Sequence, residues 1–118
     1  MMNTIEQFCL DSKLFKDFKV QWHIFRDEED YIGNYLIIQH DSGLEVRSNG
    51  LANELFFDVS LIGAVNDTKE ISETAQMFYN YVAKAKENIF LINGLPRPIY
   101  TTDLRLIYQF NLRGFNNV

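Results

Sequence analysis

The sequence predicts an α+β fold in which two helices pack on one face of an antiparallel sheet of about five strands, in the order α-β-β-β-β-α-(β)-β. Apolar residues recur at helical spacing between Asp67 and Ile89, and they alternate with polar residues in the segments on both sides. A helix with one apolar stripe must cover another surface, and the alternating segments provide a sheet for it. No linker composition or repeat divides the 118 residues, so we expect a single domain over residues 1–118.

The stretch Asp67–Ile89 has the clearest pattern. Its apolar or small residues follow one another at intervals of four and three positions, which places them on one side of an α-helix. Asp67 followed by Glu70 matches a capping box, in which each side chain accepts a backbone N–H of the first turn. The expected buried side comprises Ile71, Ala75, Phe78, Val82, Ala85 and Ile89.

Residues Thr4–Phe18 are predicted to form the first helix, with a break near Asp11–Ser12. Cys9 lies near its apolar side, where a thiol packs in a core more often than it reacts. The expected buried side comprises Ile5, Phe8, Phe15 and Phe18.

Lys19–Arg26 and Tyr31–His40 are predicted to form a β-hairpin. The first segment alternates apolar and polar residues, whereas the second is apolar on both sides, as a central strand would be. When Arg26 pairs with Tyr31 across the turn, the apolar residues of both strands fall on one shared face.

Two further strands are expected before the long helix. A turn at Asp41–Gly43 is predicted to lead into a short strand over Leu44–Ser48. A fourth strand is predicted over Leu55–Ile62, where Leu55, Phe57, Val59 and Leu61 share one side. A one-residue ambiguity in the turn leaves open which sheet face receives Leu44 and Val46.

After the long helix, Ile89–Ile92 reads as a short buried strand and Asn93–Pro98 as a loop, because its two prolines resist helix and central-strand positions. Ile99–Arg113 alternates and predicts a strand, while a helix from Thr102 capped by Gly114 is the alternative. One side of the expected strand carries Tyr100, Leu104, Leu106, Tyr108, Phe110 and Leu112.

The composition argues against several classes of protein. Acidic residues outnumber basic ones by 16 to 11, which disfavours a general nucleic-acid binder because such proteins present a basic face. A single cysteine excludes an internal disulfide and fits a reducing compartment. The first residues lack a secretory signal, and no apolar run reaches the length of a membrane span. We therefore expect a cytoplasmic protein that binds neither nucleic acid nor membrane.

Four consecutive carboxylates lie at the tip of the predicted hairpin. They repel one another, so the approach of a cationic surface is favourable, and aromatic neighbours are typical anchors of protein interfaces. The run lacks the alternating ligands and glycine of a calcium loop. The predicted partner-binding site comprises Asp27, Glu28, Glu29, Asp30, Phe25 and Tyr31.

No catalytic, metal or cofactor site is expected. The two histidines, His23 and His40, do not meet in the predicted hairpin, and no Cys or His cluster offers a zinc site. Neither a glycine-rich phosphate loop nor a nucleophile elbow is present. His23 with Arg105 or Arg113 would suit metal-free phosphodiester cleavage only if folding brought them together.

These observations favour a non-enzymatic inhibitor: an immunity protein, or a phage-type antagonist, that neutralises a toxin or nucleic-acid enzyme by occluding its basic active site. The expected partner is a basic protein, such as a toxin or nuclease domain, and the inhibitor would be a monomer or homodimer. One alternative is a small acidic secretion-type chaperone or adaptor. A metal-free nuclease is the weaker alternative.

Overall fold

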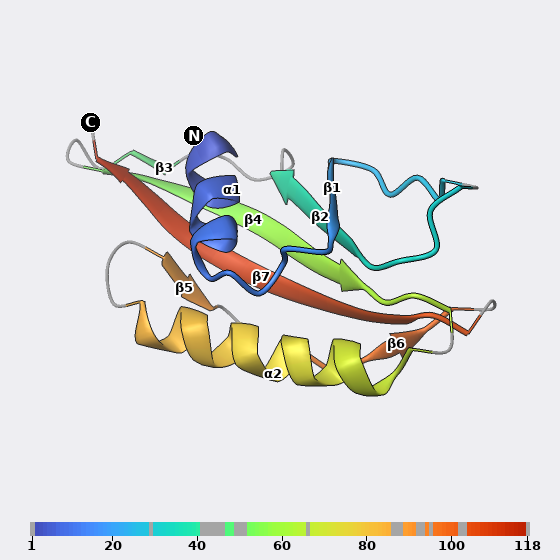
Figure 1. The fold of residues 1–118 in the computed structure, drawn as a ribbon. Helices are drawn as coiled ribbons and strands as arrows, with labels where there is room; N and C mark the ends of the chain where they lie inside the picture. The colour runs from blue at the N-terminus through green and yellow to red at the C-terminus, as the bar shows by residue number, and fades with distance from the viewer. Residues whose placement is uncertain are drawn as a thin grey trace.

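The computed structural model describes residues 2–28, 30–40, 47–48, 52–65, 67–85, 89–91, 94, 96–101 and 104–117. Two helices and seven strands occur within these residues: α1 (Met2–Asp11), β1 (Lys19–Trp22), β2 (Tyr35–His40), β3 (Arg47–Ser48), β4 (Ala52–Ile62), α2 (Lys69–Lys84), β5 (Ile89–Leu91), β6 (Ile99–Tyr100) and β7 (Leu106–Asn117). Figure 1 shows a long twisted sheet dominated by β4 and β7, with α1 and α2 packed on it. Both helices contribute to one hydrophobic cluster with one face of the sheet, so the predicted α+β class is confirmed.

Five strands form a continuous sheet in the order β1-β2-β4-β7-β5, with β3 paired to β4 and β6 paired to β7. The longest ladder joins β4 to β7 in antiparallel register, from Ala52 opposite Asn117 to Ile62 opposite Ile107. β1, however, runs parallel to β2, whereas the other pairings among the described strands are antiparallel. The prediction of an antiparallel sheet is therefore wrong, because this sheet is mixed.

The predicted hairpin between Lys19–Arg26 and Tyr31–His40 does not form. β1 ends at Trp22, and His23 adopts a left-handed backbone conformation with a φ of 72°. Residues 23–34, here called the crossing loop, then carry the chain back to the starting end of β1 before β2 begins (Figure 1). Parallel neighbours require a crossover of this kind, whereas a hairpin needs only a short turn.

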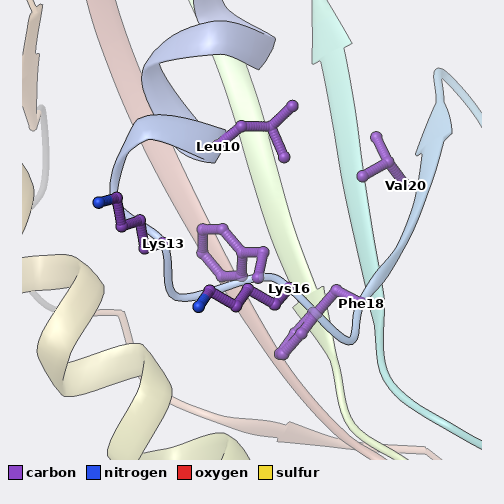
Figure 2. Close-up of a pocket in the computed structure, with 6 residues that line it drawn as sticks. Leu10, Lys13, Lys16, Phe18 and Val20 are labelled. Atoms are coloured by element: carbon purple, nitrogen blue, oxygen red, sulfur yellow. The ribbon is translucent and has the colours of Figure 1, made fainter.

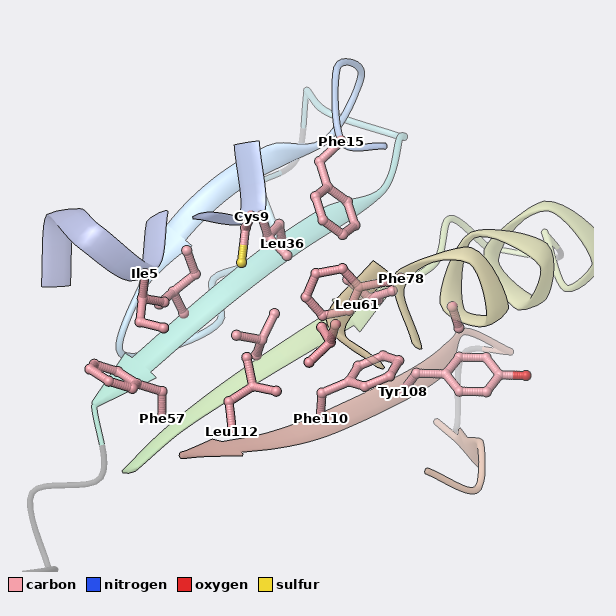
Figure 3. Close-up of a cluster of buried hydrophobic side chains, with 14 of the residues drawn as sticks. Ile5, Cys9, Phe15, Leu36, Phe57, Leu61, Phe78, Tyr108, Phe110 and Leu112 are labelled. Carbon is pink, nitrogen blue, oxygen red and sulfur yellow. The ribbon is translucent and has the colours of Figure 1, made fainter. Parts of the chain in front are cut away.

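The main hydrophobic core lies between the helices and one face of the sheet (Figure 3). The Phe78 ring on α2 lies 5.0 Å from the ring of Phe110 and 5.3 Å from that of Phe15, with both contacts edge-on. Four residues of the predicted α2 stripe are buried here, as expected: Ile71, Ala75, Phe78 and Val82. The facing sheet residues are Leu36, Ile38, Phe57, Val59, Leu61, Leu106, Tyr108, Phe110 and Leu112.

The long helix is shorter than expected but begins where its sequence indicates. Oδ1 of Asp67 accepts the backbone N–H of Glu70 at 3.3 Å, which is one half of the predicted capping box. The helix ends at Lys84, and Ile89 begins β5. The predicted short strand after the helix is therefore present, and Ile89 belongs to it rather than to the helix.

The first helix ends at Asp11, at the predicted break, and the chain beyond it is not helical up to β1. The Ser12 hydroxyl donates to the Cys9 carbonyl at 2.6 Å, which closes this end of the helix. Cys9 is fully buried, as expected. Burial, with a smaller contribution from the Glu6 carboxylate, raises the pKa of the Cys9 thiol to about 12.

The final segment is extended rather than helical, but it is not the single strand over Ile99–Arg113 that its alternation predicted, because it forms two strands, β6 and β7. β6 and β7 form a hairpin, and Leu104 in its turn has a left-handed φ of 65°. Tyr100 and Leu104 are exposed, so they do not share the core-facing side of β7. The residues that do lie on that side are Leu106, Tyr108, Phe110 and Leu112.

The turn at Asp41–Gly43 and the positions of Leu44 and Val46 lie outside the described residues. No helix in the described part of the chain is long and apolar enough to cross a lipid bilayer. The same residues include no group of three or more side chains suited to holding a metal ion.

Candidate functional site

The crossing loop carries the predicted acidic site and lies on the sheet face opposite the helices. Tyr35 is fully buried there, in a second and smaller core, because alternate residues of β2 point to opposite faces. The rings of Phe25 and Tyr31 meet the Tyr35 ring edge-on at 4.9 and 5.0 Å. Both aromatic residues of the predicted site therefore hold the loop against the sheet.

Asp27 is paired with a buried arginine. Nη2 of Arg105 donates to Oδ1 of Asp27 at 3.0 Å, and the Arg105 side chain is 7% exposed against 51% for Asp27. The guanidinium also lies 5.9 Å from the ring centre of Phe25 and 5.8 Å from that of Tyr35. A buried guanidinium requires a counterion, so Asp27 stabilises the position of the crossing loop.

Glu28 also has a partner within the chain. Its carboxylate forms an ion pair with Nζ of Lys19, and each side chain is 43% exposed. The hydrogen bond from this ammonium to Glu28 raises the pKa of Lys19. Asp30 is exposed, and Glu29 lies outside the described residues. That the acidic run binds a partner stays a prediction, although half of its carboxylates already neutralise cations of this chain.

Asn34 fixes the end of the crossing loop. Its side-chain Oδ1 accepts the N–H of Ala64 at 2.7 Å, and its carbonyl accepts the N–H of Lys19 at 2.9 Å. The Tyr31 hydroxyl lies 2.8 Å from the carbonyls of both Asn34 and Asp17. Burial raises the pKa of Tyr31. The base of the loop is thus bonded to β1 and to the connection between β4 and α2.

The residues of the nuclease alternative lie in different environments. His23 is exposed at the end of β1, with its ring 6.4 Å from that of Trp22. Arg105 is buried against Asp27 on the loop face. The side chain of His40 lies outside the described residues.

An open pocket of about 410 Å³, here called the lysine pocket, lies between the end of α1 and β1 (Figure 2). It is lined by Leu10, Lys13, Phe15, Lys16, Phe18 and Val20. The sequence analysis missed this pocket because it expected a helix up to Phe18. In a helix, these side chains would point to different sides and would not line a common pocket. The chain instead turns at Lys13, whose φ is 61°, and the following residues fold back under α1.

The hairpin of β6 and β7 ends in an exposed apolar group, here called the hairpin tip: Ile99, Tyr100 and Leu104, whose exposed fractions are 56%, 66% and 60%. It lies at the end of the sheet where α2 begins (Figure 1). Clustered exposed apolar side chains are typical of surfaces that bind other proteins. The sequence pattern had assigned Tyr100 and Leu104 to the side of the strand that faces the core.

The sequence matches the family model described as "Phage tail termination protein" over residues 1–117. No curated protein matches. Four chains of solved structures match. One of them covers 97% of this chain and 92% of its own, with a TM-score of 0.59 and 12% sequence identity, and that likeness establishes the fold alone.

The family match overturns the functional prediction. A toxin-inhibiting immunity protein was expected, as part of a toxin–antitoxin pair, and the match indicates a structural phage tail protein instead. It also contradicts the secretion-type chaperone, and it gives no support to a toxin or nuclease as the partner. The coarser expectation of a protein partner is supported, because tail termination takes place on other tail proteins. This chain belongs to the phage tail termination protein family.

Proposed function

We propose that this protein is a non-enzymatic structural component that ends the assembly of a phage tail by binding other tail proteins. The family match carries this proposal, since it spans residues 1–117 and thus the whole of the described fold. A protein that ends the growth of a protein polymer must bind its last subunit and leave no surface for the next one. Shape and surface chemistry are sufficient for that task, and no bond needs to be made or broken.

The hairpin tip supports a protein contact at one end of the molecule. Ile99, Tyr100 and Leu104 are each more than half exposed, and Leu104 has a left-handed backbone that is unfavourable for a branched side chain. Such strain persists only where the surrounding structure maintains it, and it occurs often at binding sites. We propose that the hairpin tip packs against a tail protein, burying its apolar side chains.

The crossing loop offers a second surface of different chemistry. Asp30 and Ile32 lie two positions apart and are both exposed, Ile32 to 84%, so the loop combines a carboxylate with an apolar side chain. A basic patch on a tail protein would complement it and would speed association through long-range attraction. This proposal keeps Asp30 of the predicted acidic site as the exposed carboxylate and replaces the toxin partner with a tail component.

A polymerisation assay tests the function. Tail tube protein of the same phage is polymerised alone and with increasing amounts of this protein, and tube lengths are measured by negative-stain electron microscopy. We expect the mean length to fall as the ratio rises, with gold-labelled protein at tube ends only. Unchanged lengths at saturating protein, together with no co-sedimentation with tubes, would refute the proposal.

A variant pair tests the surface. The triple variant Ile99→Ser, Tyr100→Ser, Leu104→Ser should leave tube lengths close to those without added protein, because it removes the apolar contact. The matched control is Met77→Ser, which alters a side chain that is 48% exposed on α2. Equal activity of the triple variant and the control would exclude the hairpin tip as the contact surface.

A further inference from the structure

The lysine pocket differs in charge from the rest of the molecule. The protein carries a net charge of −5, yet the charged residues that line this pocket are Lys13 and Lys16. Both are exposed, and within the described residues neither forms an ion pair. The neighbouring carboxylate of Asp11 instead accepts a hydrogen bond from Gln7 at 2.7 Å. Two ammonium groups without a counterion favour an anionic ligand.

The remainder of the pocket is apolar. Figure 2 shows the side chains of Leu10 and Val20 facing each other, with Phe18 below them, whereas the side chains of Lys13 and Lys16 extend to the left and carry their ammonium groups away from Leu10 and Val20. A volume of about 410 Å³ is sufficient for one or two apolar side chains of a ligand. The pocket therefore suits a ligand that carries an apolar group and, at some distance from it, negative charge.

β1 supplies backbone groups at the same place. It stands first in the strand order, so only one of its edges is paired within the described sheet. The N–H groups of Lys19 and His23 donate towards β2, to the carbonyls of Asn34 and Ile38, each at 2.9 Å. Because backbone groups alternate in direction along a strand, the N–H and C=O of Val20 point away from β2. An edge of this kind can accept an added strand.

We propose that the lysine pocket binds an extended acidic segment of a partner tail protein. The segment adds to the edge of β1 beside Val20 and places an apolar side chain between Leu10 and Phe18. Carboxylates of the segment pair with the ammonium groups of Lys13 and Lys16. Only the identification of the partner as a tail protein rests on the proposed function, since the chemistry of the pocket is independent of it.

Synthetic peptides test the binding chemistry. The probe is an acetylated peptide of alternating Glu and Val with one central Phe; one analogue replaces Glu by Gln, and another is N-methylated at alternate amides. Full-length ¹⁵N-labelled protein is titrated with each peptide. We expect the probe to shift the amide signals of Leu10 and Val20, and both analogues to bind roughly tenfold more weakly, because they lose ion pairs or backbone hydrogen bonds. No shift with the probe, or equal affinity for all three peptides, overturns the proposal.

A pair of double variants separates local from overall charge. Lys13→Glu with Lys16→Glu should weaken binding of the acidic peptide by at least roughly tenfold, since two attractions become repulsions. Lys69→Glu with Lys84→Glu changes two exposed lysines of α2 and alters the net charge equally. Equal weakening by both variants would show that only overall charge matters and would overturn the pocket assignment.

The peptide and tube-length assays together show whether the pocket or the proposed function is wrong. The peptide titration contains no tail component, so peptide binding together with a failed tube-length assay would refute the proposed function and leave the pocket standing. The reverse result would refute the pocket alone. If the pocket signals instead shift with the concentration of the protein itself, and the peptide does not compete, the occupant is a second copy and the assignment to a partner is overturned.

Discussion

Replacing Asp27 by Asn should loosen the crossing loop without unfolding the sheet. The substitution removes the carboxylate that accepts from Arg105 at 3.0 Å and leaves a guanidinium whose side chain is 7% exposed. Breaking a fully buried pair costs about 3–5 kcal/mol, but Asp27 is half exposed and water can partly replace it. We therefore expect a loss of about 1–2 kcal/mol in the free energy of unfolding, or a fall in Tm of roughly 4–8 °C.

A double-mutant cycle with Arg105→Met isolates the pair. Urea unfolding is followed by the fluorescence of Trp22, the single tryptophan, whose indole N–H donates to Glu6 on α1 at 2.9 Å and so reports on packing between α1 and β1. Arg105→Met should be more destabilising than Asp27→Asn, because it also removes the guanidinium from the faces of Phe25 and Tyr35. The coupling energy should be about 1 kcal/mol and should decrease in high salt.

A coupling energy below about 0.5 kcal/mol would refute the reasoning, because independent sites add within that limit. Glu28→Gln serves as the comparison, since the Lys19–Glu28 pair is half exposed on both sides. It should destabilise the protein less than Asp27→Asn. Equal effects would mean that burial of Arg105 does not determine the strength of its ion pair.

Three other measurements test the core. Cys9, whose pKa burial raises to about 12, should react with DTNB at pH 8 only as fast as the protein unfolds, and rapid labelling of the native protein would contradict its burial. Tyr81→Phe removes the hydroxyl that donates to the Phe8 carbonyl at 2.7 Å and should lower the free energy of unfolding by about 1 kcal/mol in urea, whereas Tyr79→Phe should change it less. Burial raises the pKa of Tyr31 and Tyr81, so the neutral phenols stabilise the fold fully below the unfolded value near 10, and thermal scans should show stability falling as pH rises above it.

Local periodicity was sufficient to predict the parts of the fold in which one face is buried. The stripe through Phe78 and Val82 located α2, and period-two alternation located β4 and the core-facing side of β7. These patterns report which side of an element meets the core. They do not report the direction in which an element runs.

For that reason, the sequence pattern could not predict that β1 and β2 run parallel. A hairpin and a crossover both place the apolar residues of the two segments on shared faces, so the match between pattern and turn position did not distinguish them. The deciding contacts are long-range: Arg105 meets Asp27 across 78 positions, and Asn34 meets Ala64 across 30. Neither contact has a local signature.

Local patterns also missed the surroundings of the candidate sites. Four adjacent carboxylates suggested an unpaired acidic surface, but cations distant in sequence, Arg105 and Lys19, neutralise two of them. The lysine pocket was missed because the segment between the predicted break and Phe18 was expected to be helical, whereas no helix follows Asp11 before β1. An immunity protein and a tail terminator are both compatible with a small acidic protein without a catalytic cluster, so only the family match separated them.

The position of β7 in the sheet has a consequence for biosynthesis. β7 follows every other described strand in sequence, yet it pairs with β4, β5 and β6 and covers Phe78 with Phe110. While it remains within the ribosome, the earlier segments lack the part of the core that β7 supplies, and contacts between such distant segments form slowly. Newly made chains should therefore acquire their native shape only after translation has passed β7.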